Sequence, residues 1–325
     1  MYNSLSLSGR LTMDLHALNN EGSEGNTMQT RMVDVLTFGR DGSREPKKHT
    51  VNAVSGDMFK HILVEHLIDE SKSASLPLCA GCKTFSANRI ADDDDFKKTK
   101  GWNKETKDSE ILGSALQRCV IDDCAGILIT SEIGKSRSIA RKSCVEFGWV
   151  VGIPELVTTE SYFHAKYVPE GRGKGSGEGE NLGQNIFHRP ASSGQYAVVV
   201  SVDLYKVGRN DITLEYPVDL SGRLKRTAAL LRSLMNTFLK PTGAHRNTQN
   251  PHVVNFEGLV TLSRGSLPAP LVSPLNHGYI EELEKIATAL NGLDQNAPAI
   301  ELKRFHTMGE FAETMAKLTQ QLGEA

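Results

Sequence analysis

Residues 50–61 read TVNAVSGDMFKH, a short strand that runs through Ser55-Gly56 directly into a helix with an apolar face. Serine commonly caps a helix by accepting a hydrogen bond from its first free N–H groups. The remaining N–H groups and the helix dipole attract phosphate. Lys60 and His61 follow about one turn later, and Arg31 ends the polar loop before this strand. The pattern predicts a platform for an anionic backbone rather than a catalytic pocket.

Length and composition limit the number of domains and the class of protein that the chain can form. With 325 residues and 39% hydrophobic content, it can bury one large core with insertions or two modest domains. The net charge of −2 gives no global attraction for nucleic acid, so any such binding depends on locally sorted charge. No apolar run has membrane-spanning length and no signal peptide is evident, which predicts a cytoplasmic protein without membrane contact.

Strands and helices are expected in mixed order, which indicates an α+β fold. Residues 71–130 hold the cysteine pairs and an acidic run, and are expected to form an insertion. The glycines of 170–183 predict a mobile loop. The remaining expected elements are strands at 1–18, 195–205 and 253–263, and helices at 55–70, 222–239, 277–291 and 308–322.

Cysteines give the clearest metal signal. Cys79-x2-Cys82 forms a knuckle, and Cys119-x4-Cys124 supplies two further thiols about forty residues later. These four residues predict a structural zinc site, with four unligated thiols as the alternative. The odd total of five disfavours a disulfide scaffold, and Cys144 is expected to be a buried small apolar residue.

The sequence contains no complete catalytic or nucleotide-binding motif. Gly134-Lys135-Ser136 resembles the end of a P-loop, but the glycine required five residues earlier is Ile129. Basic segments are more informative: 135–143, 172–189, the helix face with Arg223, Lys225, Arg226 and Arg232, and 245–246. Each alone is typical of a solvated surface, whereas together they predict a discontinuous track for a nucleic-acid backbone. Aromatic content of only 6% favours phosphate and ribose contacts over base stacking.

Short motifs along most of the chain resemble one family. They are Ala17-Leu18-Asn19, Glu24-Gly25-Asn26 with Arg31, Val54-Ser55-Gly56 before Lys60-His61, Asp123-x-x-Gly126-x-Leu128, Arg141-Lys142-Ser143, Ser193-Gly194-Gln195-Tyr196-Ala197, and the helix to Phe238 followed by Pro241-Thr242-Gly243-Ala244. This set resembles the crRNA-binding backbone subunit of type I CRISPR Cascade complexes, the Cas-seven family in its DevR/archaeal-type branch.

The resemblance implies a fold and its subdivision. The fold is an RRM-like, ferredoxin-type core with large insertions that form finger and thumb elements. Residues 1–70 and 190–325 would form a discontinuous palm, residues 71–150 a finger with the zinc site, and residues 151–189 a segment with the flexible Gly-rich loop. The chain lacks the paired aromatic motifs that RRM sheets usually carry.

The resemblance also implies a non-catalytic function and a set of partners. Copies of the subunit would bind crRNA in a helical filament and present the guide for pairing with target DNA. Other partners would be the repeat-handle-binding, large and small Cascade subunits and a recruited nuclease or transposition factor. No cofactor besides structural zinc is expected. The candidate RNA-binding residues are Asn26, Arg31, Ser55, Gly56, Lys60, His61, Arg137, Arg141, Lys142, Gln184, His188, Arg189, Arg226, Gly243 and Arg246.

Two alternatives remain open from the sequence. One is a type III-like backbone subunit that cleaves target RNA, for which Asp34 is the nearest candidate aspartate. The other is a zinc-stabilised protein unrelated to RNA.

Overall fold

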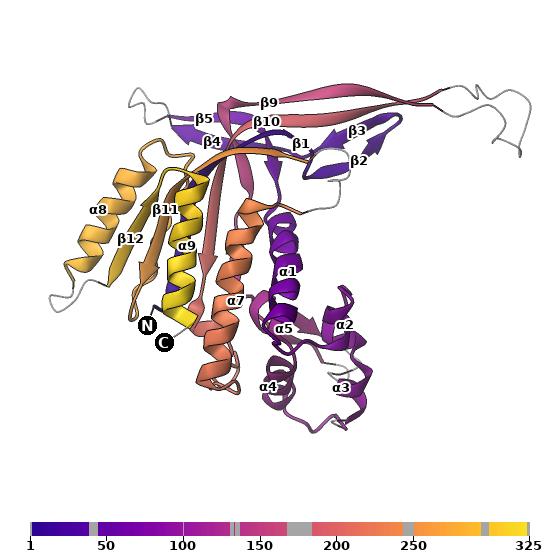
Figure 1. The fold of residues 1–325 in the computed structure, drawn as a ribbon, viewed down its shortest axis with the longest axis vertical. Helices are drawn as coiled ribbons and strands as arrows, with labels where there is room; N and C mark the ends of the chain where they lie inside the picture. Colours follow the sequence, from indigo (N-terminus) through magenta and orange to yellow (C-terminus); the bar gives the residue numbers. More distant parts are fainter. Residues whose placement is uncertain are drawn as a thin grey trace, which may run out of the picture.

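A ten-stranded sheet with helices packed against it organises the computed structural model (Figure 1). The structure describes residues 2–38, 45–99, 101–130, 133, 137–167, 184–242, 250–293 and 299–323. The fold is therefore mixed α+β, as predicted. None of the described helices is both long enough and apolar enough to cross a bilayer.

The sheet has the order β12-β11-β1-β10-β9-β5-β4, and neighbouring strands on this path are antiparallel. These strands are β1 (Ser4–His16), β4 (Met32–Phe38), β5 (Pro46–Val54), β9 (Val150–Tyr167), β10 (Gln184–Val202), β11 (His252–Ser263) and β12 (Ile300–Phe305). Three short strands attach beside this path: β2 (Asn20–Glu24), β3 (Thr27–Thr30) and β8 (Val145–Phe147).

Helices α1 (Gly56–Ser73), α7 (Leu220–Leu239) and α9 (Met308–Gly323) pack together over one face of the sheet (Figure 1). A cluster of phenylalanines lies between these helices and the sheet, with ring centroids 4.8–6.5 Å apart. The sequence did not predict this cluster. The cluster comprises Phe59, Phe147, Phe238, Phe256, Phe305 and Phe311. Helix α8 (Tyr279–Asn291) packs through Leu283 on Leu259, whose side chain points away from this cluster because strand side chains alternate.

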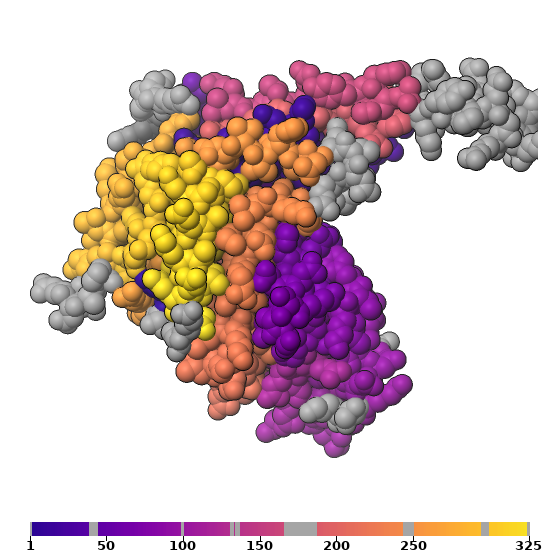
Figure 2. Space-filling model, viewed as in Figure 1, coloured from indigo at the N-terminus to yellow at the C-terminus, as the bar shows by residue number. Residues whose placement is uncertain are grey.

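The expected helices and strands from the sequence are largely confirmed, with one large extension. The strand expected at 195–205 begins at Gln184 and pairs with β9, which gives a long two-stranded arm. Figure 2 shows this arm projecting from the body of the molecule. The glycine-rich loop predicted at 170–183 lies outside the described residues.

Residues 71–130 form a small lobe, visible below the arm in Figure 2. Its helical elements are α2 (Ala80–Lys83), η1 (Arg89–Asp92), α3 (Asp94–Thr99), α4 (Asp108–Arg118) and α5 (Val120–Ala125), followed by the two-stranded sheet of β6 (Ile127–Ile129) and β7 (Ile139–Arg141). The prediction that this region lies outside the regular sheet is correct for these residues, whereas β8 returns to the main sheet beside β10.

A buried ionic network fixes this lobe to α7. The Asp123 carboxylate accepts hydrogen bonds from Arg141 at 2.9 Å, Arg226 at 2.7 Å and the Gly208 backbone N–H at 2.9 Å. The prediction that Arg226 lies on the outer face of its helix is wrong: Arg226 and Arg141 are only 2% and 3% exposed. Hydrophobic periodicity could not reveal this, because an arginine that has a carboxylate partner can be buried.

Replacing Asp123 with alanine should lower the free energy of unfolding by about 3–5 kcal/mol, because buried Arg226 loses its counter-charge and buried Arg141 keeps only Asp211. Chemical denaturation followed by circular dichroism measures this change. The control is Asp34→Ala, which removes an exposed ion pair with Lys48 and should leave stability near that of the unchanged protein. Equal effects of the two substitutions would contradict the assigned role of Asp123.

Candidate nucleic-acid interface and metal-binding cluster

The N-terminus of α1 is capped as predicted. Ser55 accepts a hydrogen bond from the Met58 N–H at 3.2 Å, and its own N–H donates to Asn19 Oδ1 at 2.9 Å. Gly56 begins the helix against Phe147, where an added Cβ would lie 2.3 Å from the Phe147 carbonyl oxygen. The sequence Ser-Gly therefore sets both the cap and the close contact with the strand beside it.

Arg31 is held next to this helix terminus. Its N–H donates to the Asn19 carbonyl at 3.1 Å, and its carbonyl accepts from Asn52 at 3.0 Å and from Ala53 N–H at 3.0 Å. Because Asn19 bonds to both Arg31 and Ser55, one asparagine positions the two predicted phosphate contacts. The Arg31 guanidinium lies 5.4 Å from the Trp149 ring centre and pairs with Glu21, leaving its side chain 39% exposed.

Lys60 opens onto two adjoining hollows on the lobe side of α1. The first, about 440 Å³, is also lined by His61, Cys82, Ser86 and Arg89. The second, about 640 Å³, is lined by Lys60, Arg89 and residues of β6 and β7. Burial lowers the pKa of the Lys60 amine, and the nearby Arg89 charge lowers it further. Among the described residues no carboxylate forms an ion pair with Lys60, so its charge remains available to an anion.

Arg89 was missed by the sequence reading. It begins a short 3-10 helix within a stretch that has no regular hydrophobic period, and no motif marks it. His61, which was predicted, lies 3.3 Å from Glu65 and packs edge-on against Phe85 with centroids 5.2 Å apart. We define the surface of Lys60, His61 and Arg89 as the α1–lobe groove.

Those other predicted RNA-binding residues that the structure describes lie in different parts of it. Asn26 and His188 lie together, since the His188 N–H donates to the Asn26 carbonyl at 2.8 Å, and Arg189 stacks over Phe187. Arg137 is bound to Asp108 on the lobe, and Lys142 is exposed. Gly243, Arg246 and the side chain of Gln184 lie outside the described residues.

The side chains of Arg141 and Arg226 are not exposed at the α1–lobe groove, because both are buried against Asp123. Asp34, the candidate for RNA cleavage, lies on β4 and accepts hydrogen bonds from Thr50 and Lys48, each at 2.7 Å. The Lys48 hydrogen bond lowers its pKa, which favours a structural ionised carboxylate.

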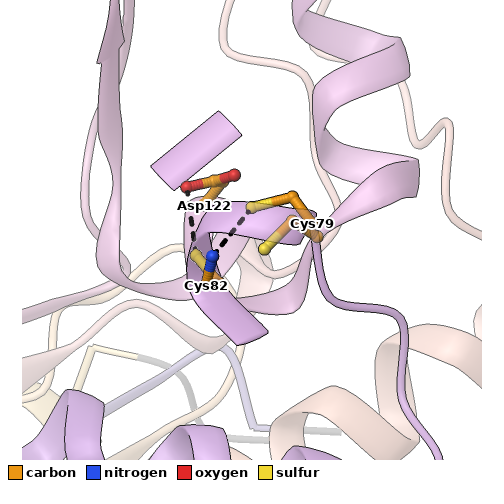
Figure 3. A group of neighbouring side chains, drawn as sticks. Cys79, Cys82 and Asp122 are labelled. Carbon is orange, nitrogen blue, oxygen red and sulfur yellow. Dashed lines mark hydrogen bonds between the residues drawn. The ribbon is translucent and has the colours of Figure 1, made fainter. Parts of the chain in front are cut away.

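A buried group of Cys79, Cys82, Cys119 and Asp122 could hold a metal ion. Figure 3 shows three of these side chains, Cys79, Cys82 and Asp122, close together. The ligand atoms of all four residues lie within 4.8 Å of one another, and thiolates around one tetrahedral zinc lie about 3.8 Å apart. Hydrogen bonds from Cys119 and Cys82 lower the pKa of Cys79 to about 5. Burial raises the pKa of Asp122, whose Oδ2 has no hydrogen-bond partner. An uncompensated buried carboxylate beside three thiols is the donor set that a zinc ion would satisfy.

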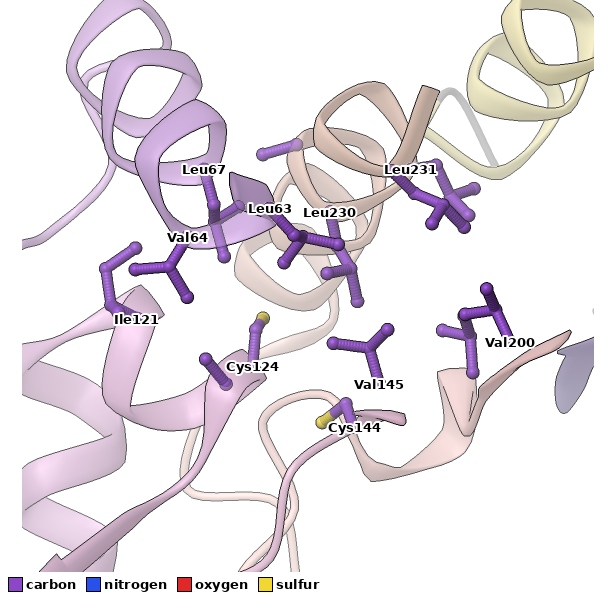
Figure 4. Close-up of a cluster of buried hydrophobic side chains, with 14 of the residues drawn as sticks. Leu63, Val64, Leu67, Ile121, Cys124, Cys144, Val145, Val200, Leu230 and Leu231 are labelled. Atoms are coloured by element: carbon purple, nitrogen blue, oxygen red, sulfur yellow. The ribbon is translucent and has the colours of Figure 1, made fainter. Parts of the chain in front are cut away.

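The fourth member of the cluster differs from the sequence prediction. Cys124 lies instead in the hydrophobic core beside Leu63, Val145 and Leu230 (Figure 4). Helix α5 explains the exchange, because Asp122 follows Cys119 by three residues and returns to the same side, whereas Cys124 follows by five. Cys144 is buried in the same core, as predicted.

Comparison with known proteins gave one family and several distant structures. A family model described as "CRISPR-associated negative auto-regulator DevR/Csa2" matches residues 7–284. Curated proteins gave no match. A chain of a pre-nicking CRISPR RNA-guided surveillance complex is 13% identical over 97% of this chain and 99% of that chain, with a TM-score of 0.47. Csc2 of Thermofilum pendens is 13% identical over 98% and 85%, with a TM-score of 0.41.

Substituting Gly56 with alanine should lower the free energy of unfolding by about 1–3 kcal/mol, because the added methyl group meets the Phe147 carbonyl. Gly309→Ala is the control, since its added Cβ meets only Thr307 Oγ1 at 3.8 Å and should be neutral or slightly stabilising. Denaturant titration of both variants measures the difference. A Gly56 variant as stable as the Gly309 variant would contradict the close contact.

Proposed function

The chain belongs to the DevR/Csa2 family of CRISPR-associated proteins, and we propose that it is a non-catalytic, multicopy subunit that binds the crRNA backbone in a type I effector complex. The observation that carries the proposal is the joint placement of Arg31 and the capped terminus of α1 by Asn19. Both groups recognise phosphate without regard to base identity. The Watson–Crick edges of the guide would remain free to pair with target DNA.

The strand order supports an RRM-like core. Along the chain, β1, α1, β9, β10, α7 and β11 alternate as strand, helix, strand, strand, helix, strand. In space the four strands run β11-β1-β10-β9, with every neighbour antiparallel. The β-α-β-β-α-β connectivity is that of the ferredoxin-like motif. We assign residues 1–70 and 190–325 to the palm, residues 71–150 to the finger, and residues 151–189 to a thumb segment.

Assembly into a filament along one crRNA is the second part of the proposal. Large apolar side chains are exposed on the edge strand β4 and on the β9–β10 arm, among them Leu36 at 63%, Phe38 at 61% and Phe163 at 59%. Exposed apolar surface of this kind favours protein contacts, and we assign it to neighbouring copies. Because contacts add along a shared strand, moderate basicity in each copy suffices. The remaining partners would be target DNA and the other Cascade subunits in the cytoplasm.

Structural zinc is the proposed cofactor, bound by Cys79, Cys82, Cys119 and Asp122. The ion would supply the positive charge that the buried thiols and Asp122 require. It would also link the turn at 79–83 to α5, which lies about forty residues later in the chain.

Replacing Arg31 or Lys60 with alanine should weaken binding of single-stranded RNA about fivefold to tenfold, equally for different sequences, because each loses a phosphate contact. The slope of log affinity against log salt should fall by about 0.7 per contact. Fluorescence anisotropy with two unrelated RNAs measures both quantities. Lys285→Ala, on the exposed side of α8, is the charge-matched control. Sequence-dependent losses, or equal losses in the control, would count against the proposed backbone grip.

Metal analysis should find about one zinc per chain, since four converging ligands define one tetrahedral site. Cys82→Ser should lose the metal and destabilise the lobe, whereas Cys124→Ala should retain it, because Cys124 lies in the core. Mass spectrometry of the native protein and elemental analysis provide the measurement. Loss of zinc by the Cys124 variant would restore the four-cysteine set, and retention of zinc by the Cys82 variant would contradict both sets.

A further inference from the structure

The metal-binding cluster and the α1–lobe groove share one wall. Cys82 is a member of the cluster and also lines the 440 Å³ hollow, together with Lys60, His61 and Arg89. Ile121, next to the ligand Asp122, lines the same hollow. A change in the position of the ligands therefore changes the shape of the groove.

Arg89 contacts both chain segments that supply the ligands. Its backbone lies against Gly81, between Cys79 and Cys82, where an added Cβ would be 2.1 Å from the Arg89 carbonyl oxygen. Its guanidinium donates a hydrogen bond to the carbonyl of Gly126, the residue that ends α5. Helix α5 carries Asp122 and is preceded directly by Cys119. The two ends of Arg89 thus rest on the two halves of the cluster.

The backbone around Arg89 adopts an unfavourable conformation. Arg89 has φ = 50° and Phe85 has φ = 58°, in the left-handed region that residues with a Cβ rarely occupy. Such conformations persist only where surrounding structure holds them. The turn from 79 to 92 is joined to α5 through Arg89 itself and through the cluster, so a cross-link at the cluster would hold the strained turn.

We propose that a metal ion bound by Cys79, Cys82, Cys119 and Asp122 fixes Arg89 beside Lys60 and thereby raises the affinity of the α1–lobe groove for an RNA phosphodiester backbone. This inference rests on the proposed function and adds a regulatory link to it. Cross-linking the two segments removes conformational freedom before RNA arrives, so binding loses less entropy. By linkage, RNA raises the affinity for the metal by the same factor.

The test uses the full chain freed of nucleic acid, zinc, and a fluorescein-labelled single-stranded RNA of mixed sequence. Removing zinc should weaken RNA binding by the unchanged protein about tenfold. Arg89→Ala should bind RNA about tenfold more weakly with zinc present and show no further loss when zinc is removed. Lys83→Ala is the matched control, because Lys83 is an exposed cation on the same turn and lines neither hollow. It should retain the affinity and zinc dependence of the unchanged protein.

A second measurement keeps the protein in its metal-bound form. Competition with a chromophoric chelator gives the zinc affinity with and without RNA, and RNA should raise it about tenfold in the unchanged protein but not in Arg89→Ala. The inference is overturned if Arg89→Ala binds RNA normally, or if its RNA and zinc affinities remain coupled. Weakened binding by Arg31→Ala alone would then leave the proposed function standing. An unchanged, zinc-loaded chain that binds no RNA would overturn both.

Discussion

One buried carboxylate holds the parts of this molecule in a fixed relation. Asp123 lies at the centre of hydrogen bonds from Arg141 on β7, Arg226 on α7 and the Gly208 backbone. These elements belong to the lobe, to a helix over the main sheet and to the loop that joins the sheet to that helix. Hydrophobic packing alone tolerates sliding, whereas a fully paired buried charge has few alternative partners. The groove between α1 and the lobe consequently has a defined shape.

The same network explains why charge composition is a poor guide to this protein's binding surface. Arg141 and Arg226, two arginines of the basic segments, are buried in ion pairs with Asp123. Arg232 is paired with Glu70 across the α1–α7 contact. Fewer cations face solvent at the candidate interface: Arg31, paired with Glu21 and 39% exposed, lies near the capped helix terminus, and Lys60 lies beside Arg89. A nearly neutral chain can thus present a local cationic surface.

Local signals in the sequence were sufficient for features that depend on local physics. The Ser55 cap, the strand at the N-terminus and the long helices follow from capping chemistry and from hydrophobic periods of 3.6 and 2. The two cysteine pairs likewise identified three of the four clustered residues, Cys79, Cys82 and Cys119. Asp122 takes the place of Cys124 because of the local geometry of α5, which cysteine spacing alone does not reveal. The burial of Arg226 and the role of Arg89 were not predictable, because both depend on pairing between segments distant in the chain. The domain limits and the RNA-contact set remain predictions.

The central position of β1 has a consequence for synthesis. Leu5 pairs on one side with Val202 and on the other with Leu262, so β1 waits during synthesis for partners that are translated much later. Until then its apolar side chains have no sheet to enter, and such high contact order slows folding and exposes the nascent chain to aggregation. Chaperone capture of nascent β1 is the expected consequence of placing a strand between two partners that are synthesised much later.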